Sequence, residues 1–348
     1  MTIRVLIVDD SALMRKLLQT RLASEADIEV VGCACDAQEA RGLIKALDPD
    51  VVTLDIEMPG MDGLSFLAKI MELRPTPVII VSGATQEGNA VTVQALQLGA
   101  VSCYAKNDRH GSLPGNDGGE LAALVREAAG VNLLPRRSTA APASAAPFPS
   151  PTRAAAESAL IAIGASTGGV EALRTLLSRF PLDCPPTLIV QHVNARFAPA
   201  IAQSLDGACE PRVVLAGTDV PVERGHIYLA PGGDRHLLLA GAGSLGFRTV
   251  LRAGEPVCGH QPSVDMLFGS VAETAGPAAT GILLTGMGCD GAKGLARMAA
   301  KGSFTIAQDE ASCVVFGMPR AAIEMGAASI VLPLDRIAGH IFDRAEAA

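Results

Sequence analysis

Short apolar runs alternate with amphipathic stretches along most of this 348-residue chain, and this alternation restricts the fold more than any other feature. In the first half, segment 11–23 has Leu13, Leu17 and Leu18 at helical spacing. Around such helices lie five strand-like runs: IRVLIVDD (3–10), IEVVGCA (28–34), DVVTLD (50–55), PVIIVSG (77–83) and AVSCYAK (100–106). Continuous apolar strands joined by helices predict a five-stranded parallel sheet with helices on both faces, and ligands gather at the carboxyl ends of such strands.

The same alternation resumes in the second half. Its strand-like runs are ALIAIGA (159–165), PTLIVQH (186–192), HIYLAPG (226–232), GILLTG (281–286), FTIAQD (304–309) and SIVLPL (329–334). Helical patterns lie near residues 170–179, 263–275 and 291–301. The runs 235–241 and 245–251 are joined by a glycine-rich turn and favour an antiparallel hairpin. We expect a second α/β domain with a mostly parallel sheet and a β-hairpin.

A change of composition separates the two halves. Residues 131–157 read VNLLPRRSTAAPASAAPFPSPTRAAAE, in which proline, alanine and serine dominate and no apolar period recurs. We therefore expect two domains, 1–129 and 158–348, joined by a linker over 130–157. A long ordered loop wrapped on one domain is the alternative, although structureless loops of this length are uncommon inside compact domains.

The composition also restricts the class of protein. A net charge of −8 argues against an indiscriminate nucleic-acid binder, which would present a basic face. The apolar runs are strand-length, and the first ten residues lack the apolar region of a signal peptide. The eight cysteines have no C-x-x-C spacing, which favours free thiols. We expect a cytoplasmic protein with no nucleic-acid partner and no direct membrane insertion.

Charged and hydroxyl side chains end several strands of the first domain. Asp9 and Asp10 follow the first strand and Asp55 ends the third, so their mutual repulsion calls for a hard cation such as Mg²⁺. Ser82 and Lys106 end the fourth and fifth strands, where they can hold the oxygens of a phosphoryl group on a carboxylate. Considered alone, an aspartate in such a position is more often a turn former or helix cap.

In the second domain, residues 164–168 read GASTG and fit the G-x-S-x-G pattern around Ser166. Small neighbours allow a sharp turn that exposes the hydroxyl, and the following helix offers free N–H groups where an oxyanion would form. The residues alone leave two interpretations open. Ser166 is either a nucleophile or a hydroxyl that caps this helix.

A nucleophilic serine needs a base. His192 is the first candidate, because it ends the strand expected to neighbour that of Ser166, and parallel neighbours bring their carboxyl ends together. His226, His236 and His260 are not excluded by spacing, and His236 and His260 are also candidates for substrate contact. A lone histidine is more often a hydrogen-bonding core residue.

The base in turn needs an orienting carboxylate. Asp290 lies between a predicted strand and helix in a glycine-rich turn, where it would otherwise cap the helix. Asp234 and Asp265 compete for the role, but neither follows so clear a strand. The order serine, histidine, aspartate differs from the order in α/β-hydrolases, which argues against that fold.

The first domain resembles the receiver domains of two-component response regulators in VDDS, LDIEMPGMDG, the strand-ending Ser82 and AK at Lys106. The resemblance implies a flavodoxin-like fold in which a histidine kinase phosphorylates Asp55. It also implies a Mg²⁺ site made by Asp10, Asp55 and the backbone carbonyl of Glu57, with Asp9 in support. Cys103 and Asn107 depart from the family, which commonly has an aromatic residue and a proline at these positions. Tyr104 is adjacent, but strand alternation points it to the other face.

The whole chain resembles the chemotaxis response regulator protein-glutamate methylesterase (CheB) family. The matching motifs are IGASTGG, VQH, YLAPGGDRHL, HQPSVDMLF and LLTGMGCDGAKGL. The resemblance implies Ser166 as nucleophile, His192 as general base and Asp290 as its partner, with the Met287 N–H in the oxyanion hole and Thr167 assisting. After VQH the family commonly has a Pro-Gly-Phe loop, whereas this chain reads VNARFAPAIAQSL, which puts substrate contact near Arg196 and Phe197 in question.

The resemblance further implies hydrolysis of glutamate γ-methyl esters on chemoreceptors, with methanol as product, and deamidation of receptor glutamines. The chemotaxis histidine kinase would be the phosphodonor, and the unphosphorylated receiver would pack over the active site. Mg²⁺ is expected in the receiver and no cofactor in the catalytic domain. A DNA-binding output would need a helix-turn-helix with a basic recognition helix, which the second domain does not offer. A non-catalytic adaptor remains an alternative.

Overall fold

The computed structural model describes residues 2–58, 63–83, 86–106, 119–131, 159–241 and 246–342. It divides into two compact units, Met1–Arg136 and Arg137–Ala348. Nearly all of the predicted linker lies outside the described residues, and so does Asn107. No helix within the described ranges combines the length and apolar character needed to cross a membrane.

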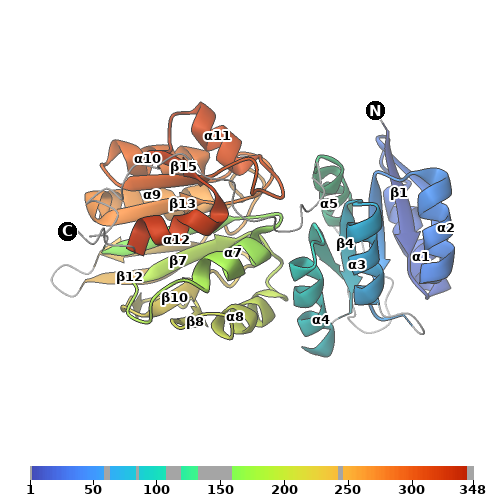
Figure 1. Ribbon diagram of the computed structural model, residues 1–348, viewed down its shortest axis with the longest axis horizontal. Helices are drawn as coiled ribbons and strands as arrows, with labels where there is room; N and C mark the ends of the chain where they lie inside the picture. The colour runs from blue at the N-terminus through green and yellow to red at the C-terminus, as the bar shows by residue number, and fades with distance from the viewer. Residues whose placement is uncertain are drawn as a thin grey trace. The chain divides into compact units, whose positions relative to one another are not determined.

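The first unit is the predicted parallel α/β sheet. Its strand order is β2-β1-β3-β4-β5, every recorded pairing is parallel, and helices cover both faces (Figure 1). The strands are β1 (Ile3–Val8), β2 (Ile28–Ala34), β3 (Val51–Asp55), β4 (Val78–Ser82) and β5 (Ser102–Ala105). The helices are α1 (Ala12–Leu22), α2 (Ala37–Leu47), α3 (Gly63–Leu73), α4 (Gln86–Gln97) and α5 (Glu120–Ala129). All five expected strands are confirmed.

Helix α1 begins where its sequence predicts but buries a different stripe. The Ser11 side chain caps it by accepting a hydrogen bond from the Met14 N–H. Leu18 and Leu22 are buried, whereas Leu13 is 70% exposed. Leu13 lies off the buried face because five helical residues rotate its side chain by about 140° from the face that Leu18 presents to the sheet.

The second unit contains a seven-stranded sheet in the order β15-β14-β13-β6-β7-β10-β8. All of its recorded pairings are parallel. Its strands are β6 (Leu160–Ala165), β7 (Thr187–Gln191), β8 (Arg212–Leu215), β10 (His226–Leu229), β13 (Ala279–Leu283), β14 (Phe304–Gln308) and β15 (Ile330–Leu332). The predicted hairpin, β11 (Arg235–Gly241) with β12 (Phe247–Ala253), forms a separate antiparallel sheet with the short β9 (Val220–Pro221).

Two layers of helices cover this sheet. Helix α7 packs on both α12 and α8, and α10 packs on both α9 and α11 (Figure 1). Their bounds are α7 (Gly169–Leu177), α8 (Ala198–Asp206), α9 (Val264–Thr274), α10 (Ala292–Ala300), α11 (Met318–Glu324) and α12 (Leu334–Phe342). Strand β6 is buried along its whole length, as its continuous apolar sequence predicts for a central strand.

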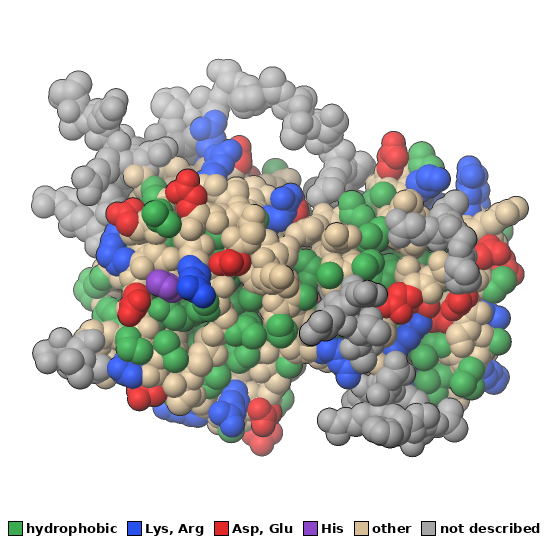
Figure 2. All heavy atoms as spheres, turned by 90° about the horizontal axis from the view of Figure 1, so that it is seen from below, with side chains coloured by type: hydrophobic (Ala, Val, Ile, Leu, Met, Phe, Trp, Pro, Cys, Tyr) green, Lys and Arg blue, Asp and Glu red, His purple; other side chains and the backbone are tan. Residues whose placement is uncertain are grey.

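Charged side chains of both signs are mixed on the face of each unit that Figure 2 shows. On the face shown in Figure 2, Lys and Arg side chains alternate with Asp and Glu, and hydrophobic side chains lie between them. The described residues on this face form no continuous basic surface of the kind that binds a nucleic-acid backbone.

Candidate active site

The ends of three neighbouring strands bring Ser166, His192 and Asp290 into one region. Strand β6 lies between β7 and β13, and the chain order reverses there, because it runs from β6 to β7 on one side and returns to β13 on the other. Ala165 pairs with Gln191, so Ser166 and His192 are the residues that directly follow one register pair. Such a reversal is where ligands bind in open parallel sheets.

Ser166 is held in its turn by main-chain contacts. Its N–H donates to the Thr285 carbonyl at 3.0 Å, and its carbonyl accepts from the Gly169 N–H at 2.7 Å. Gly286 approaches so closely that a Cβ there would lie 2.7 Å from the Ser166 Cβ, so only glycine fits. The turn after β13 therefore packs directly against the serine.

The helix-cap interpretation of Ser166 is wrong. The N-cap residue of α7 is Gly168, with φ of 75°, and no side chain makes a capping hydrogen bond. Glycine suits this left-handed conformation, because an L side chain there is strained. The Ser166 hydroxyl is thus not engaged in capping.

His192 and Asp290 form a buried pair. His192 Nε2 lies 2.9 Å from Asp290 Oδ2, while the other ring nitrogen, Nδ1, is buried and has no hydrogen-bond partner among the described residues. One nitrogen is therefore fixed by a carboxylate and the other remains for a proton transfer, which is the division of labour that a serine nucleophile requires of its base.

A cradle of donors holds the Asp290 carboxylate at the N-terminus of α9. Besides His192, its donors are Ser263 Oγ (2.8 Å), Val264 N (2.7 Å), Asp265 N (3.0 Å) and Gly291 N (3.0 Å). Burial opposes the charge, but His192 and these hydrogen bonds outweigh it and hold the pKa of Asp290 below its usual value. The N-cap residue of α10 is Gly291, so the expected alternative of Asp290 as that cap is wrong.

The competing carboxylates do not hold His192. The Asp234 side chain is 90% exposed, and its recorded ion pair is a 3.8 Å contact with Arg235. Asp265 lies in the first turn of α9 and accepts a hydrogen bond from the Gly294 N–H at 2.6 Å. Neither has a recorded contact with His192.

Two other histidines support the site. His236 is buried, and its Nδ1 accepts the Ser263 N–H at 3.1 Å, so it helps to set the residue that donates to Asp290. His260 stacks on His192 with ring centroids 3.8 Å apart and planes at 10°. His226 contacts the Arg224 carbonyl and Tyr228 instead. The stacking of His260 could not be found from spacing, because its loop has no regular period.

The burial of the His260 imidazole leads to a prediction about how stability depends on pH. Burial, followed by the neighbouring charge of His192, lowers the pKa of His260 from 6.5 to about 4, although Asp290 acts in the opposite direction. Between these pH values the unfolded chain binds more protons, so the free energy of unfolding falls as the pH drops from 6.5 to 4, by up to about 3 kcal/mol. In the His260→Gln variant, the free energy of unfolding, measured by urea unfolding at several pH values, should depend less steeply on pH than in the wild type. If the free energy of unfolding changed equally with pH in both proteins, His260 would not be the source of this pH dependence.

The turn after β13 also contains Met287. Thr285 fixes the start of this turn, since its hydroxyl donates to the Thr167 carbonyl at 2.9 Å and accepts the Val315 N–H at 2.9 Å. No acceptor for the Met287 N–H is recorded in the part of the chain that the structure describes. Thr167 is buried beside Ser166. Thr167 thus adjoins the serine along the chain, and Met287 follows Gly286, which packs against the serine. Their roles in catalysis stay predictions.

In the segment after His192, Phe197 is fully buried and packs in the core. Arg196 is half-buried in the preceding turn, where its backbone N–H donates to Asn194 Oδ1 at 3.1 Å. Of the two positions, only Arg196 is partly exposed.

The receiver carboxylates meet as the strand order predicts. Val8 pairs with Leu54, so Asp9 and Asp55 follow one register pair. Lys106 Nζ lies 2.9 Å from Asp9 Oδ2 and 2.6 Å from Asp55 Oδ2. Burial opposes the charge on Lys106, but these carboxylates outweigh it and raise the Lys106 pKa. Burial raises the pKa of Asp9, against the influence of Lys106.

The remaining receiver residues surround this pair. One oxygen from each of Asp9, Asp10 and Asp55 lies within 4.8 Å of the others, a donor set that suits a hard cation such as Mg²⁺. Ser82 is buried at the end of β4, and its carbonyl accepts the Lys106 N–H at 2.7 Å. The Glu57 N–H donates to Asp55 Oδ1 at 3.1 Å.

In β5, the neighbouring side chains of Cys103 and Tyr104 lie on opposite sides of the sheet. The Tyr104 hydroxyl contacts Arg21 of α1, so this side chain faces the α1 side of the sheet. Cys103 is buried, and by strand alternation it faces the other side. Tyr104 therefore does not take the place of the missing aromatic residue, as alternation predicts.

Comparison with known proteins decides the family. A family model described as CheB methylesterase matches residues 161–341, more than half of the chain, and one described as response regulator receiver domain matches residues 5–128. The chain belongs to the CheB methylesterase family. It thus combines a receiver domain with a hydrolase of the methylesterase class, as its motifs predict.

Curated CheB-family relatives extend over nearly the full chain. A protein-glutamate methylesterase/protein-glutamine glutaminase of Caulobacter vibrioides is 50% identical, covering 99% of this chain and 98% of its own. One from Bordetella avium is 49% identical over 99% of this chain and 97% of its own. The CheB methylesterase catalytic domain of Thermotoga maritima, a crystal structure, is 34% identical with a TM-score of 0.51, covering 53% of this chain and 97% of that one.

Proposed function

We propose that this chain hydrolyses glutamate γ-methyl esters on chemoreceptors by a Ser166-His192-Asp290 triad that phosphorylation of the receiver activates. The observation that carries the proposal is the His192 ring, which Asp290 holds through Nε2 while the buried Nδ1 has no partner among the described residues. The curated relatives carry names that state protein-glutamate methylesterase activity.

In the first half of the reaction, Ser166 Oγ attacks the ester carbonyl and His192 Nδ1 takes its proton. The carbonyl oxygen becomes an oxyanion, and the Met287 N–H, with help from Thr167, stabilises it there. The C–O bond to the methoxy group breaks, and the His192 proton passes to the departing methanol. Asp290 stays ionised and stabilises the imidazolium, an assignment that its lowered pKa supports.

In the second half, water attacks the glutamyl ester on Ser166. His192 Nδ1 removes a proton from the water and then returns one to Ser166 Oγ as glutamate is released. A glutamine amide enters the same path with ammonia as the leaving group, so the proposal includes glutamine deamidation. No step needs a metal ion in this domain.

In the receiver, Asp55 accepts the phosphoryl group from the chemotaxis histidine kinase. Asp10, Asp55 and the Glu57 carbonyl would hold Mg²⁺, which neutralises charge on the phosphoryl oxygens, and Asp9 supports this set. Lys106 moves its contacts from the carboxylate to the phosphoryl oxygens, and Ser82 donates to them. The unphosphorylated receiver restrains the catalytic domain, and phosphorylation shifts the population toward the active state.

Methanol release from methylated chemoreceptors, with and without a small-molecule phosphodonor, tests function and switch together. We expect release in both conditions and a faster rate with the phosphodonor. A protein that releases no methanol in either condition would be a non-catalytic adaptor. Residues 158–348 alone should be at least as fast as the unphosphorylated full chain, and a slower rate would count against restraint by the receiver.

Asp55→Asn should abolish phosphorylation and activation while it preserves the basal rate, because Asp55 takes no part in ester cleavage. Intact-mass measurement after treatment with the phosphodonor would show one added phosphoryl group on the wild type and none on the variant. Asp50→Asn, an exposed aspartate at the opposite end of β3, is the matched control. Unchanged activation in Asp55→Asn would contradict the assignment.

A further inference from the structure

The imidazole of His192 is oriented in part by its hydrogen bond with Asp290. Nε2 lies 2.9 Å from Asp290 Oδ2, and Nδ1 is buried without a hydrogen-bond partner among the described residues. The torsion that turns a histidine ring, χ2, has broad minima, so rotamer preference does not fix the plane of the ring. A ring that turned about its bond to Asp290 would carry Nδ1 away from the direction that proton transfer needs. A second contact must therefore hold this plane.

His260 supplies such a contact. Its ring stacks on that of His192 with centroids 3.8 Å apart and planes at 10°. Non-bonded carbon atoms attract one another best at about 3.5–4.0 Å, so the two ring faces are in van der Waals contact. A tilt of the His192 ring in either sense would push one of its edges into the face of His260. The stacking thus restricts the angle that the hydrogen bond with Asp290 leaves free.

The loop that carries His260 is closed by its own main chain. Val257 N donates to His260 O at 3.1 Å, and His260 N donates to Val257 O at 2.9 Å. The two residues between them, Cys258 and Gly259, both have positive φ, 52° and 79°. Two positive φ angles in succession are typical of the tight two-residue turns that join hairpin strands. The backbone of this turn therefore fixes where the His260 ring begins.

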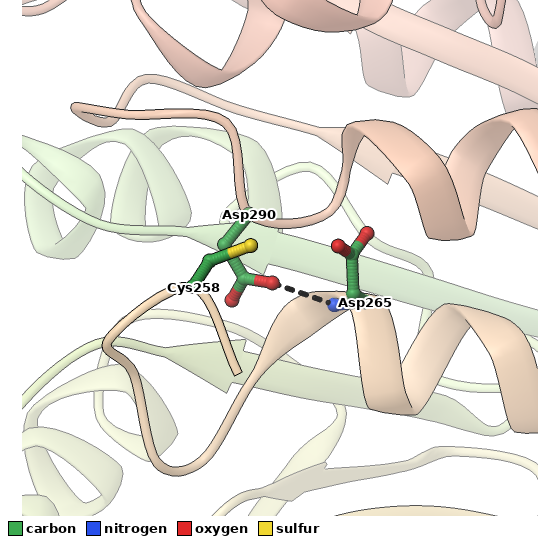
Figure 3. A group of neighbouring side chains, drawn as sticks. All are labelled: Cys258, Asp265 and Asp290. Atoms are coloured by element: carbon green, nitrogen blue, oxygen red, sulfur yellow. Dashed lines mark hydrogen bonds between the residues drawn. The ribbon is translucent and has the colours of Figure 1, made fainter. Parts of the chain in front are cut away.

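The same turn lies against Asp290. The Cys258 sulfur lies within 4.8 Å of a carboxylate oxygen of Asp290 and of Asp265, and Figure 3 shows the three side chains together. The carboxylate at Nε2 of His192 and the ring on its face thus belong to segments that pack on each other. The two contacts that orient His192 are held in one arrangement.

The stacking also argues that His260 acts through His192 and not as a second base. The N–H bond and the lone pair of an imidazole lie in the plane of its ring, so two parallel stacked rings cannot pass a proton directly between them. Burial, followed by the charge of His192, lowers the pKa of His260 to about 4, although Asp290 acts in the opposite direction. His260 is therefore neutral near pH 7 and adds no positive charge beside the imidazolium of His192.

We propose that His260 is a positioning residue for the hydrolase, whose ring holds His192 in the plane where Nε2 meets Asp290 and Nδ1 is available for the proton of Ser166. The inference rests on the proposed triad and adds to it a residue that acts only through the base. This role requires a flat ring and no ring nitrogen. A displacement of about 1 Å in a catalytic site costs on the order of a hundredfold in rate, which sets the loss expected when the ring is removed.

Two variants separate the plane of the ring from its nitrogens. His260→Phe keeps a flat ring without nitrogens, and His260→Gln keeps polar atoms without a ring. In methanol release by the full chain from a methylated chemoreceptor, His260→Gln should lose on the order of a hundredfold in kcat with KM within about twofold, and His260→Phe should keep kcat within about threefold. His226→Gln is the matched control with wild-type rates, because it removes a half-buried histidine whose ring contacts the Arg224 carbonyl and Tyr228.

The rate at which a fluorophosphonate labels Ser166 gives the same comparison without a receptor. A Gln variant with the wild-type kcat, a Phe variant as slow as the Gln variant, or a Gln variant altered in KM alone would overturn the proposal. A thermal melt checks folding. If the Gln variant does not fold, a slow Phe variant still overturns the inference and a fast one supports it. A wild-type protein that neither releases methanol nor labels Ser166 would refute the triad instead.

Discussion

Replacing Ser166 by alanine will lower methanol release from a methylated chemoreceptor by at least about a thousandfold, because removal of a triad nucleophile eliminates the acyl-enzyme route. The variant should fold normally. The Ser166 contacts that hold the turn are made by its N–H and carbonyl, and α7 is capped by Gly168. Rates with wild-type and variant protein at equal receptor concentration provide the measurement.

Ser178→Ala is the matched control for this substitution, because Ser178 is an exposed serine at the other end of the same helix. Its hydroxyl donates to the local Thr175 carbonyl at 2.9 Å. We expect wild-type rates from this variant. If Ser166→Ala released methanol as fast as Ser178→Ala, another group would be the nucleophile.

Asp290→Asn will lower the rate by about ten-thousandfold and will also reduce thermal stability. All the recorded partners of Asp290 donate to it, so an amide group in place of one oxygen points hydrogens at donors. His192 then loses its acceptor, and the N-terminus of α9 loses a negative charge near its dipole. Methanol release and a thermal melt measure the two effects.

Asp234→Asn separates this effect from a simple change of charge, because it removes the same charge from a side chain that is 90% exposed. We expect it to leave both the rate and the melting temperature near those of the wild type. Asp290→Asn with a normal rate would mean that His192 works without this carboxylate, and the triad would have to be abandoned.

Most of the fold could be predicted because parallel strands bury both faces and therefore appear as continuous apolar runs. The expected strands of both domains are present, and their carboxyl ends bring the candidate residues together. Strand β8 was not predicted, because only Val213 of its four residues is buried and the strand begins with the exposed Arg212. The hairpin was predicted, but its placement in a separate sheet depends on tertiary pairing with β9.

For the candidate site, the sequence could predict which residues lie at the ends of strands but not the contacts that they make there. Sequence spacing could not decide between a nucleophile and a cap at Ser166, since one turn suits both, and the structure excludes the cap by placing Gly168 there. The cradle around Asp290 comes from α9, a helix that begins 26 residues earlier in the chain. Such contacts depend on how the layers pack, which no local pattern encodes. The catalytic roles themselves stay predictions.

Labelling by a fluorophosphonate tests the central claim most directly, because this reagent reports an activated serine without any choice of receptor or kinase. The protein is incubated with the reagent, digested and analysed by mass spectrometry, alongside His192→Ala. The proposed triad predicts one label per chain, on Ser166, and at least about a hundredfold slower labelling in the variant. Labelling of a different residue, or equal rates in both proteins, would contradict it.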